Sequence, residues 1–398
     1  MNVLVVADGH YYQTPDGNVY VESVYDYGFY KRYLSVFEHV YAVARIEKVD
    51  ARPFGKKISS GEGVSFLALP SYTGPIEYLH KYISIKKCVH DFCKVGDCAI
   101  FRIPAATSNS FFKPFLKTQK PFAVELVVDP WENFAPGSID SVLRPLIRIS
   151  WTRLVKKMCK TANGASYVTT NYLQSKYPCK AHLGQNGFTA SYSSVELPDD
   201  SYAQPRVYTD KTNWVISHVA NSFSDNGKGH VPLMKAVSLV REKGYDVSIR
   251  FIGDGPKMQE FKNTAKKLNI DQSVVFLGRL PSSKEVRQVL SDSDMFVFPT
   301  KAEGLPRGLL EAMSEALPCI SSPTCGIPEV LDKKFMYSYD DYEGFANCII
   351  RLISNVDLMT EASKRNLEVS KRFSSNILNN RRKEFYSQLA QCVKRNHK

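Results

Sequence analysis

The sequence lacks long apolar runs. No segment approaches the roughly 18 uninterrupted apolar residues that a membrane-spanning helix needs. Its start, MNVLVVADGHYY, lacks the basic segment, apolar core and small-residue cleavage site of a secretory signal. We therefore expect a globular protein of the cytoplasm, and its 398 residues are enough for two domains that each bury a core.

A regular cysteine pattern is also lacking. Nine cysteines, an odd number, are scattered along the chain, which favours reduced thiols over a disulfide framework. Cys88, His90, Cys93 and Cys98 do lie close in sequence, and thiolate and imidazole groups are zinc ligands. Their spacing has no second cysteine pair and falls on an amphipathic helical pattern, so we favour a structural role over a zinc site.

Acidic residues are too few to balance the basic ones. The formal net charge is +12, which attracts anions such as phosphates, nucleic acids or an acidic membrane face. Part of this charge lies in a helix-like C-terminal segment, and its basic residues are Arg381, Arg382, Lys383, Lys394, Arg395 and Lys398. Two interpretations are open for this run: a solvated helix face, which we favour, and a contact with anionic lipid headgroups.

The first half begins with a short β-branched run, Val3 to Ala7, that ends in Asp8-Gly9 and is typical of a buried parallel strand. Residues 10–17 are predicted to form a loop at its carboxyl end, where ligands of open α/β sheets collect. His10 is therefore a candidate site residue, although an ordinary surface histidine fits as well. Helical patterns then alternate with short apolar runs, which predicts a parallel sheet flanked by helices. The predicted helices are 24–37 and 76–92, and the predicted strands are 40–44, 64–68, 98–102 and 122–127.

The second half shows a stricter alternation of strand and helix with short Gly- or Pro-bearing loops, which predicts a doubly wound α/β domain. A segment rich in Pro, Asp and Ser separates the halves and is predicted to be a linker. The predicted parts are an N-terminal domain (1–195), the linker (196–211), a C-terminal domain (212–375) and a final helix (376–398).

Two helix starts in the second half carry groups suited to phosphate. Lys228-Gly229 comes directly before a helix, so an ammonium group lies at the positive end of a helix dipole. Glu303-Gly304-Leu305-Pro306 leads into another helix at Arg307, whose guanidinium adds a forked donor. Glu311 lies in the second turn of that helix. Carboxylates at such positions accept hydrogen bonds from sugar and ribose hydroxyls, although Glu311 taken alone is typical of a solvated helix residue.

The order of several motifs extends this pattern. They are Lys228-Gly229, the segment FIGDGP ending at Pro256, FLGR ending at Arg279, DMFVFPT ending at Thr300, Glu303 to Met313, and Gly326-Ile327-Pro328-Glu329. Together they resemble the retaining glycosyltransferases of family 4 over about residues 214 to 332. This resemblance implies the GT-B fold, in which two doubly wound α/β domains face each other across a cleft. The C-terminal domain then holds a nucleotide sugar and the N-terminal domain the acceptor.

The resemblance also implies roles for individual residues. Lys228 should contact the donor diphosphate, Glu303 the transferred sugar and Glu311 the ribose hydroxyls. The donor-binding set that it implies is completed by Gly253, Gly255, Arg279, Leu280, Gly304, Leu305 and Arg307. An arginine that the family often has before the Lys-Gly pair is missing here, so a second cationic phosphate contact would fall to Arg307. No metal and no other cofactor is expected. The D-x-D spacing at Asp292 and Asp294 is interpreted as helix capping and packing.

The acceptor side is less well marked. The stretch FAVELVVDPWE, residues 122–132, takes the place of a family strand that ends at the cleft. Asp129 is the first choice for a group acting on the acceptor hydroxyl and Glu132 the second, with a structural role open for both. His10 completes the predicted acceptor side. VVDPW looks like transferases of bacterial capsule and surface polysaccharide assembly, which implies a glycan or polyprenyl-diphosphate-linked acceptor at the inner face of the plasma membrane.

Two other classes of protein share some of these features. A nucleic-acid-binding protein would explain the charge, but it predicts basic and aromatic residues interleaved on one surface and gives no reason for the ordered motifs. A non-catalytic nucleotide-sugar-binding protein would keep Lys228 and Glu311 but should have lost Glu303, which is present. We therefore predict an enzyme that transfers a hexosyl group and does not bind nucleic acid.

Overall fold

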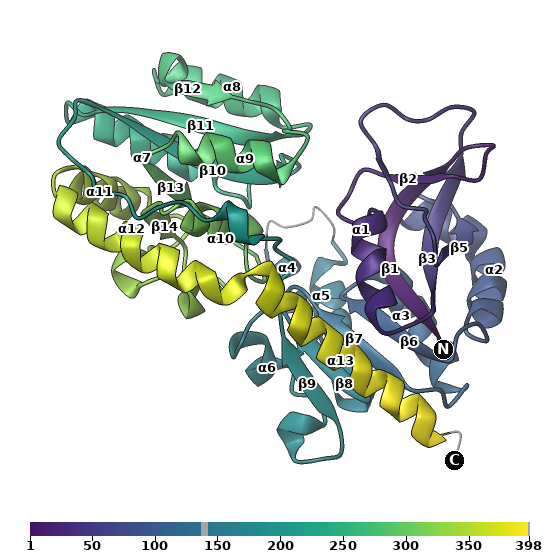
Figure 1. The fold of residues 1–398 in the computed structure, drawn as a ribbon. Coiled ribbons are helices and arrows are strands. Elements are labelled where there is room, and N and C mark those ends of the chain that lie inside the picture. The colour runs from purple at the N-terminus through teal and green to yellow at the C-terminus, as the bar shows by residue number, and fades with distance from the viewer. Residues whose placement is uncertain (137–141, 397–398) are drawn as a thin grey trace.

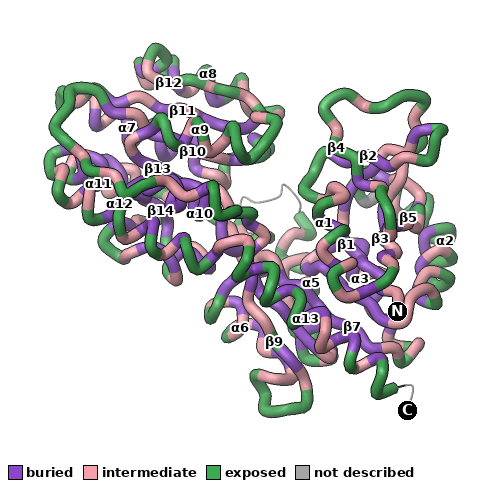
Figure 2. Tube along the Cα trace, viewed as in Figure 1, coloured by how far each residue is buried: buried purple, intermediate pink, exposed green. Residues whose placement is uncertain are grey.

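Two β-sheets, each flanked by helices, form the two halves of the chain (Figure 1). The computed structural model describes residues 1–136 and 142–396. The strands of the first sheet end at Ser191, and those of the second begin at Asn213. Both sheets are buried in the middle, with exposed residues on the outer sides of the helices (Figure 2).

The first sheet is parallel over seven strands, in the order β5-β3-β1-β6-β7-β8-β9. Two short strands, β2 and β4, extend it antiparallel beside the end of β1. The strands are β1 (Asn2–Gln13), β2 (Val19–Val21), β3 (His39–Lys48), β4 (Lys57–Ile58), β5 (Val64–Pro70), β6 (Cys98–Ile103), β7 (Phe122–Leu126), β8 (Gly164–Tyr167) and β9 (Phe188–Ser191).

Two predictions for this half are wrong. The strand β1 does not end before His10 but continues to Gln13, because its last residues pair with β3 and with β2 in a hairpin-like extension. His10 therefore lies on an extended strand and not in a loop. The predicted helix 24–37 is reduced to α1 (Tyr27–Lys31) and the 3₁₀ turn η1 (Arg32–Ser35), since Asp26 caps the helix by accepting from the Phe29 N–H.

Helices cover both faces of the first sheet. On one face η1 contacts the C-terminal helix, and on the other α2 and α3 contact each other. Right-handed crossovers place α5 in the same layer as α3, because both follow strands that step in the same direction across the sheet. The remaining helices of this half are α2 (Gly74–Phe92), α3 (Ala106–Leu116), α4 (Pro130–Asn133), α5 (Arg144–Thr161), α6 (Tyr172–Lys176) and the 3₁₀ turns η2 (Ala181–Leu183) and η3 (Asp199–Ser201).

The second sheet has five parallel strands in the order β12-β11-β10-β13-β14, and its elements follow the predicted alternation closely. Its strands are β10 (Asn213–Ser222), β11 (Asp246–Asp254), β12 (Val274–Phe276), β13 (Met295–Phe298) and β14 (Cys319–Ser321). Its helices are α7 (His230–Glu242), α8 (Met258–Lys267), α9 (Ser283–Ser291), α10 (Arg307–Ser314), α11 (Tyr342–Ile353) and α12 (Val356–Ser370), with 3₁₀ turns at Asp271–Ser273, Ile327–Glu329, Lys333–Phe335 and Lys371–Phe373.

The C-terminal helix α13 (Ser375–Asn396) runs from the second half across the first sheet (Figure 1). The Arg382 guanidinium donates to the Ser193 carbonyl at 2.6 Å, and the Tyr386 hydroxyl donates to Glu125 at 3.0 Å. Arg382 is only 6% exposed, so the expectation of a uniformly solvated or lipid-facing basic run is wrong at this residue. Its charge belongs to the packing between α13 and the sheet.

Candidate active site

The two predicted donor residues Lys228 and Glu303 lie together. Gly229 has a positive φ of 81°, and a Cβ there would lie 1.8 Å from the Pro299 carbonyl oxygen, so only glycine allows this close approach. The approach brings Lys228, at the start of α7, beside the loop that follows β13. The Lys228 ammonium forms an ion pair with the Glu303 carboxylate and donates to the Ala302 carbonyl at 3.2 Å.

Gly304 places this loop against the first half of the molecule. A Cβ at Gly304 would lie 2.1 Å from the carbonyl oxygen of Val127, which follows β7, and 2.8 Å from a methyl group of Val168, which follows β8. The carboxyl ends of the first sheet therefore meet the donor loop. The helix α10 begins three residues later without a side-chain cap, so first-turn N–H groups remain for a ligand.

Glu311 is buried in the second turn of α10, with 7% of its surface exposed. Within residues 1–136 and 142–396 no group hydrogen bonds to or pairs with its carboxylate. Burial raises the pKa of Glu311, while the nearby Arg307 and Arg287 lower it in part. A buried carboxylate without a partner is costly, which favours a role in binding a ligand that donates hydrogen bonds.

The other predicted donor residues surround this corner. Gly253, near the end of β11, lies against the Ala220 carbonyl of β10 and donates its N–H to the Gly278 carbonyl at 2.9 Å, which joins the end of β11 to the loop after β12. Gly255 packs against the backbone of Phe223. Arg279 is paired with Glu22 of the first half, so in this structure its guanidinium bridges the halves. Among the rest, Leu305 is buried, and Leu280 and Arg307 are half-buried.

Asp129 is not presented to the cleft as a free base. It is fully buried and caps α4 by accepting from the Trp131 N–H at 2.8 Å. Its carboxylate also accepts hydrogen bonds from the Tyr177 and Tyr172 hydroxyls and from the Lys176 ammonium. This arrangement fits the structural alternative that the sequence left open.

The other two acceptor-side predictions differ in access. Glu132 is 29% exposed at its side chain, and its carboxylate lies 3.8 Å from the Lys176 ammonium, so it is the more accessible of the two carboxylates of this stretch. His10 is exposed on β1 near Asp8 and Arg45. The roles of both toward an acceptor stay predictions.

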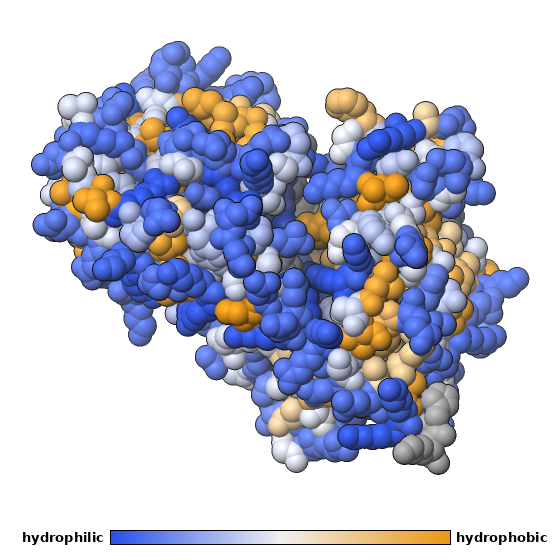
Figure 3. All heavy atoms as spheres, viewed as in Figure 1, coloured by the Kyte–Doolittle hydropathy of each residue, from blue (hydrophilic) through white to orange (hydrophobic). Residues whose placement is uncertain are grey.

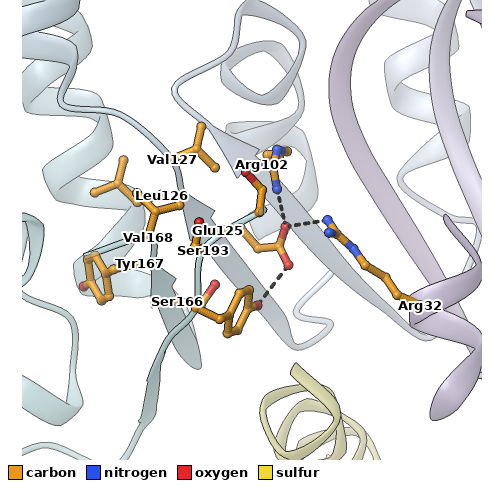
Figure 4. Close-up of a pocket in the computed structure, with 11 residues that line it drawn as sticks. Arg32, Arg102, Glu125, Leu126, Val127, Ser166, Tyr167, Val168 and Ser193 are labelled. Carbon is orange, nitrogen blue, oxygen red and sulfur yellow. Dashed lines mark hydrogen bonds and ion pairs between the residues drawn. The ribbon is translucent and has the colours of Figure 1, made fainter. Parts of the chain in front are cut away.

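A polar pocket that no sequence pattern indicated lies at the carboxyl ends of β6, β7 and β8 (Figure 4). Arg102 of β6, Glu125 of β7 and Ser166 of β8 are neighbours in register, so their side chains share one face of the sheet. Arg102 and Arg32 approach the Glu125 carboxylate to 3.0 and 3.7 Å. The signal in the sequence was a single charged residue inside each of two otherwise apolar strands.

The Glu125 carboxylate is fully satisfied. Three tyrosine hydroxyls donate to it in addition to the two guanidinium groups: Tyr33 at 3.2 Å, and Tyr192 and Tyr386 at 3.0 Å each. Burial alone would raise the pKa of Glu125, but the arginines and tyrosines lower it below its ordinary value. Val127 and Val168 line the same pocket and also touch Gly304, so the pocket adjoins the donor corner.

Glu329, from the last motif of the second half, holds the two halves together. Its carboxylate accepts from the backbone N–H groups of Thr170, Asn171 and Tyr172 at 2.6 to 2.9 Å, and from the Thr170 hydroxyl at 2.6 Å. These donors lie at the start of α6 in the first half. A carboxylate at a helix N-terminus is favoured by the helix dipole, so Glu329 anchors the cleft from one side.

The sequence has two groups with metal-ligand residue types, the cysteine cluster near Cys93 and the D-x-D spacing at Asp292 and Asp294. Among the residues that the structure describes, no group of three or more His, Cys, Asp or Glu could hold a metal ion. The Asp294 carboxylate accepts from the Val215 N–H at 2.8 Å and from Lys211 at 2.6 Å, in line with the packing role predicted for the D-x-D spacing.

Comparison with known proteins places this site in a family context. A family model described as glycosyl transferases group 1 matches residues 214–355, which contain every predicted donor residue. Protein CapJ of Staphylococcus aureus is 26% identical over 339 residues, 84% of this chain and 83% of that protein. A UDP-Gal:α-D-GlcNAc-diphosphoundecaprenol α-1,3-galactosyltransferase of Escherichia coli is 32% identical over 106 residues, about a quarter of either chain.

A solved structure shows the same fold over the whole chain. The Anabaena protein HepE, in complex with UDP and glucose, matches with a TM-score of 0.67 at 13% sequence identity and covers 99% of this chain and 100% of its own. The predicted fold of two doubly wound domains is thereby confirmed. Among the described residues no helix is long and apolar enough to cross a membrane.

Proposed function

Since this chain is a glycosyltransferase of the GT-B fold, we propose that it transfers a sugar, with retention at the anomeric carbon and without a metal ion, from a nucleotide diphosphate to a hydroxyl. The acceptor is a glycan or a lipid-linked oligosaccharide of bacterial surface polysaccharide assembly. The observation that carries this proposal is the Lys228–Glu303 pair between the starts of α7 and α10, together with the buried Glu311 carboxylate of α10, which has no partner among the described residues.

The pair has complementary tasks once a donor is bound. Negative charge develops on the leaving diphosphate, and a cation and helix N-termini aimed at it stabilise the transition state. The Lys228 ammonium lies beside the loop that leads into α10, the first turn of α10 has no side-chain cap, and Arg307 adds a second cation there. When Lys228 turns to the phosphates, the Glu303 carboxylate becomes available to accept hydrogen bonds from sugar hydroxyls.

Glu311 supplies the site for the ribose. Its carboxylate has no hydrogen-bond donor among the described residues and is buried in the second turn of α10. Two ribose hydroxyls are neutral donors at a spacing that one carboxylate can accept. Their binding offsets the cost of the buried charge, which makes the site selective for a ligand with a diol.

The acceptor approaches from the first half. The Arg102–Glu125 pocket adjoins Gly304 through Val127 and Val168, and the partly exposed Glu132 lies in α4, which follows β7. Closure of the halves would exclude water, which competes with the acceptor hydroxyl for the donor. The Escherichia coli relative is named for a diphosphoundecaprenol-linked acceptor, which supports a lipid-linked acceptor and a place at the inner face of the plasma membrane.

Thermal stabilisation by nucleotide sugars tests the donor site. The purified chain is heated with UDP-, GDP- and ADP-sugars, and we expect the melting temperature to rise with one nucleotide class. Lys228→Ala should abolish this rise, because it removes the cation from the diphosphate. Lys235→Ala, an exposed lysine on the same helix, is the matched control and should keep it. A rise that survives in Lys228→Ala would contradict this placement of the donor, and NMR of the product's anomeric centre decides between retention and inversion.

A further inference from the structure

Two helices of the first half expose apolar residues in a helical stripe. In α2, Ile76, Leu79 and Ile83 are 71%, 70% and 84% exposed, while the opposite side packs on the sheet. In α5, Leu146 and Ile149 are 66% and 39% exposed. Surface helices normally turn such residues to the core and charged residues to water, so these stripes indicate a partner. Figure 3 shows apolar atoms reaching the surface on the side of the first half that carries β5 and α2.

The charge of α5 shows what kind of partner fits. This helix carries six Lys and Arg residues and no Asp or Glu. Four of them follow the apolar residues and are exposed: Arg153, Lys156, Lys157 and Lys160. An apolar stripe continued by cations is the pattern of a helix that lies in a membrane interface, with its apolar side chains among acyl chains and its cations at anionic headgroups.

The apolar ends of both helices lie at the same edge of the sheet. The helix α2 follows the carboxyl end of β5, and α5 follows that of β7 by way of α4, so both helices begin at the carboxyl edge and run back along one layer. That edge meets the donor loop at Gly304. Of the two stripes, that of α5 lies nearer the donor loop, because α5 packs on α4, which follows β7, whereas α2 follows β5 at the far edge of the sheet (Figure 1).

A tryptophan lies at the same place. Trp131 of α4 is 40% exposed, and the Arg148 guanidinium of α5 stacks over its ring at 3.9 Å while donating to its carbonyl at 2.6 Å. An amphipathic ring beside an arginine is typical of the headgroup level of a bilayer. The Trp131 ring therefore indicates how deeply the carboxyl edge of the first sheet would enter the bilayer.

We propose that this surface, defined by Ile76, Leu79 and Ile83 of α2, Trp131 of α4, Leu146 and Ile149 of α5 and the four basic residues of α5, docks on an anionic lipid bilayer. Docking would hold the mouth of the cleft at headgroup level, where a lipid-linked acceptor presents its sugar. This last step rests on the proposed function, but the docking itself does not.

The surface differs from the one suggested by the C-terminal basic run. Arg382 is buried against Ser193, and Arg381 donates to the Ser191 carbonyl at 3.2 Å, so the run is divided between packing and solvent. The helix α13 also lies on the opposite side of the sheet from α2 and α5. A membrane contact through α2 and α5 therefore leaves α13 away from the bilayer.

Co-sedimentation of the full chain with vesicles tests the proposal. We expect binding to phosphatidylcholine vesicles that contain phosphatidylglycerol, weaker binding to phosphatidylcholine alone, and release by salt. The double variant Leu146→Glu with Ile149→Glu should lower the affinity roughly tenfold or more, and Arg153→Gln with Lys157→Gln should do the same for anionic vesicles only. The controls are Val207→Glu and Val275→Glu, which are exposed apolar positions outside the surface, and Lys266→Gln with Lys267→Gln on α8.

The outcomes separate the possibilities. Loss of vesicle binding in the surface variants but not in the controls, with unchanged melting temperatures, supports the proposal. No binding of the unaltered chain at low salt, or equal loss in the controls, overturns it. Self-association that the surface variants abolish, without any vesicle binding, would identify a protein-docking face and overturn it as well. The nucleotide-sugar shift is measured in the same samples, so failure of the donor site is seen separately from failure of docking.

Discussion

Two buried glutamates, Glu125 in the first half of the molecule and Glu311 in the second, lie in opposite electrostatic environments. Glu125 in the first half is 2% exposed and receives two arginines and three tyrosine hydroxyls, and its pKa is lowered. Glu311 in the second half is 7% exposed and receives no hydrogen bond from the described residues, and its pKa is raised. The two carboxyl groups are thus buried to a similar extent, but their pKa values are shifted in opposite directions.

The difference separates a structural charge from a binding charge. A carboxylate whose partners come from the protein stabilises the fold in which they are assembled, and its removal leaves buried cations unpaired. A carboxylate whose partners are missing weakens the free protein and strengthens a complex that supplies them. The comparison predicts that mutation of Glu125 acts first on stability and mutation of Glu311 first on ligand binding.

The largest effect is expected from Glu125→Gln. This change leaves Arg32 and Arg102 buried without a counter-charge, which should cost about 3–5 kcal/mol in the free energy of unfolding. Because the pKa of Glu125 is lowered in the folded state, its contribution is present above its ordinary pKa and is lost as pH falls through the lowered value. Denaturant unfolding at neutral and acidic pH measures both.

The matched control for this prediction is Glu38→Gln. Glu38 pairs with the N-terminal ammonium but its side chain is 82% exposed, so its loss should change the free energy of unfolding by only a few tenths of a kcal/mol, on the order expected for exposed pairs. Equal effects of the two variants would show that the Glu125 cluster is not a stabilising unit.

The second half should instead be sensitive to acid through its histidines. His218 and His230 are completely buried behind the Lys228 corner, and burial lowers their pKa values to about 4 and about 2. Their unfolded forms take up protons below pH 6.5 while the folded forms stay neutral, so stability falls as pH falls below that value. At pH 5 each should cost roughly 2 kcal/mol relative to neutral pH.

His230→Phe should remove its share of this loss. Neither ring nitrogen of His230 has a partner among the described residues, and the ring stacks on Phe261 at 4.3 Å, so phenylalanine fits chemically. Unfolding of the variant and of the unaltered chain is compared at pH 7 and pH 5, with the exposed His80→Gln as control. A stability difference that does not change with pH would contradict this origin of the acid sensitivity.

The two halves also differ in how far the sequence could predict them. In the second half the strands, helices and the Lys228–Glu303 corner follow from local patterns, since short loops join neighbouring strands and place motifs at one sheet edge. In the first half the Arg102–Glu125–Arg32 cluster joins residues from three distant elements, and no spacing connects them. The extension of β1 through His10 likewise depends on pairing with β2 and β3.

The burial of individual side chains is the second property that the sequence alone does not predict. The place of Asp129 after a strand predicts a cleft residue, yet its carboxylate caps α4 and accepts hydrogen bonds from side chains of α6 and from Tyr177. The apolar pattern of α2 is the same whether its second stripe meets protein, lipid or water, so only the structure shows that Ile83 is exposed. A pattern identifies apolar residues but not their neighbours.

The smallest and most informative effect is expected from Glu311→Gln. Because the pKa of Glu311 is raised in the folded state, ionisation destabilises the fold as pH rises from the ordinary value through the raised one. The neutral amide avoids this cost, so the free variant should melt slightly higher at pH 7, by a few degrees at most for about 1 kcal/mol. The nucleotide-sugar shift should be lost, since an amide accepts hydroxyl hydrogen bonds less strongly. A variant that is less stable and still responds to nucleotide would place Glu311 with Glu125, as a structural charge.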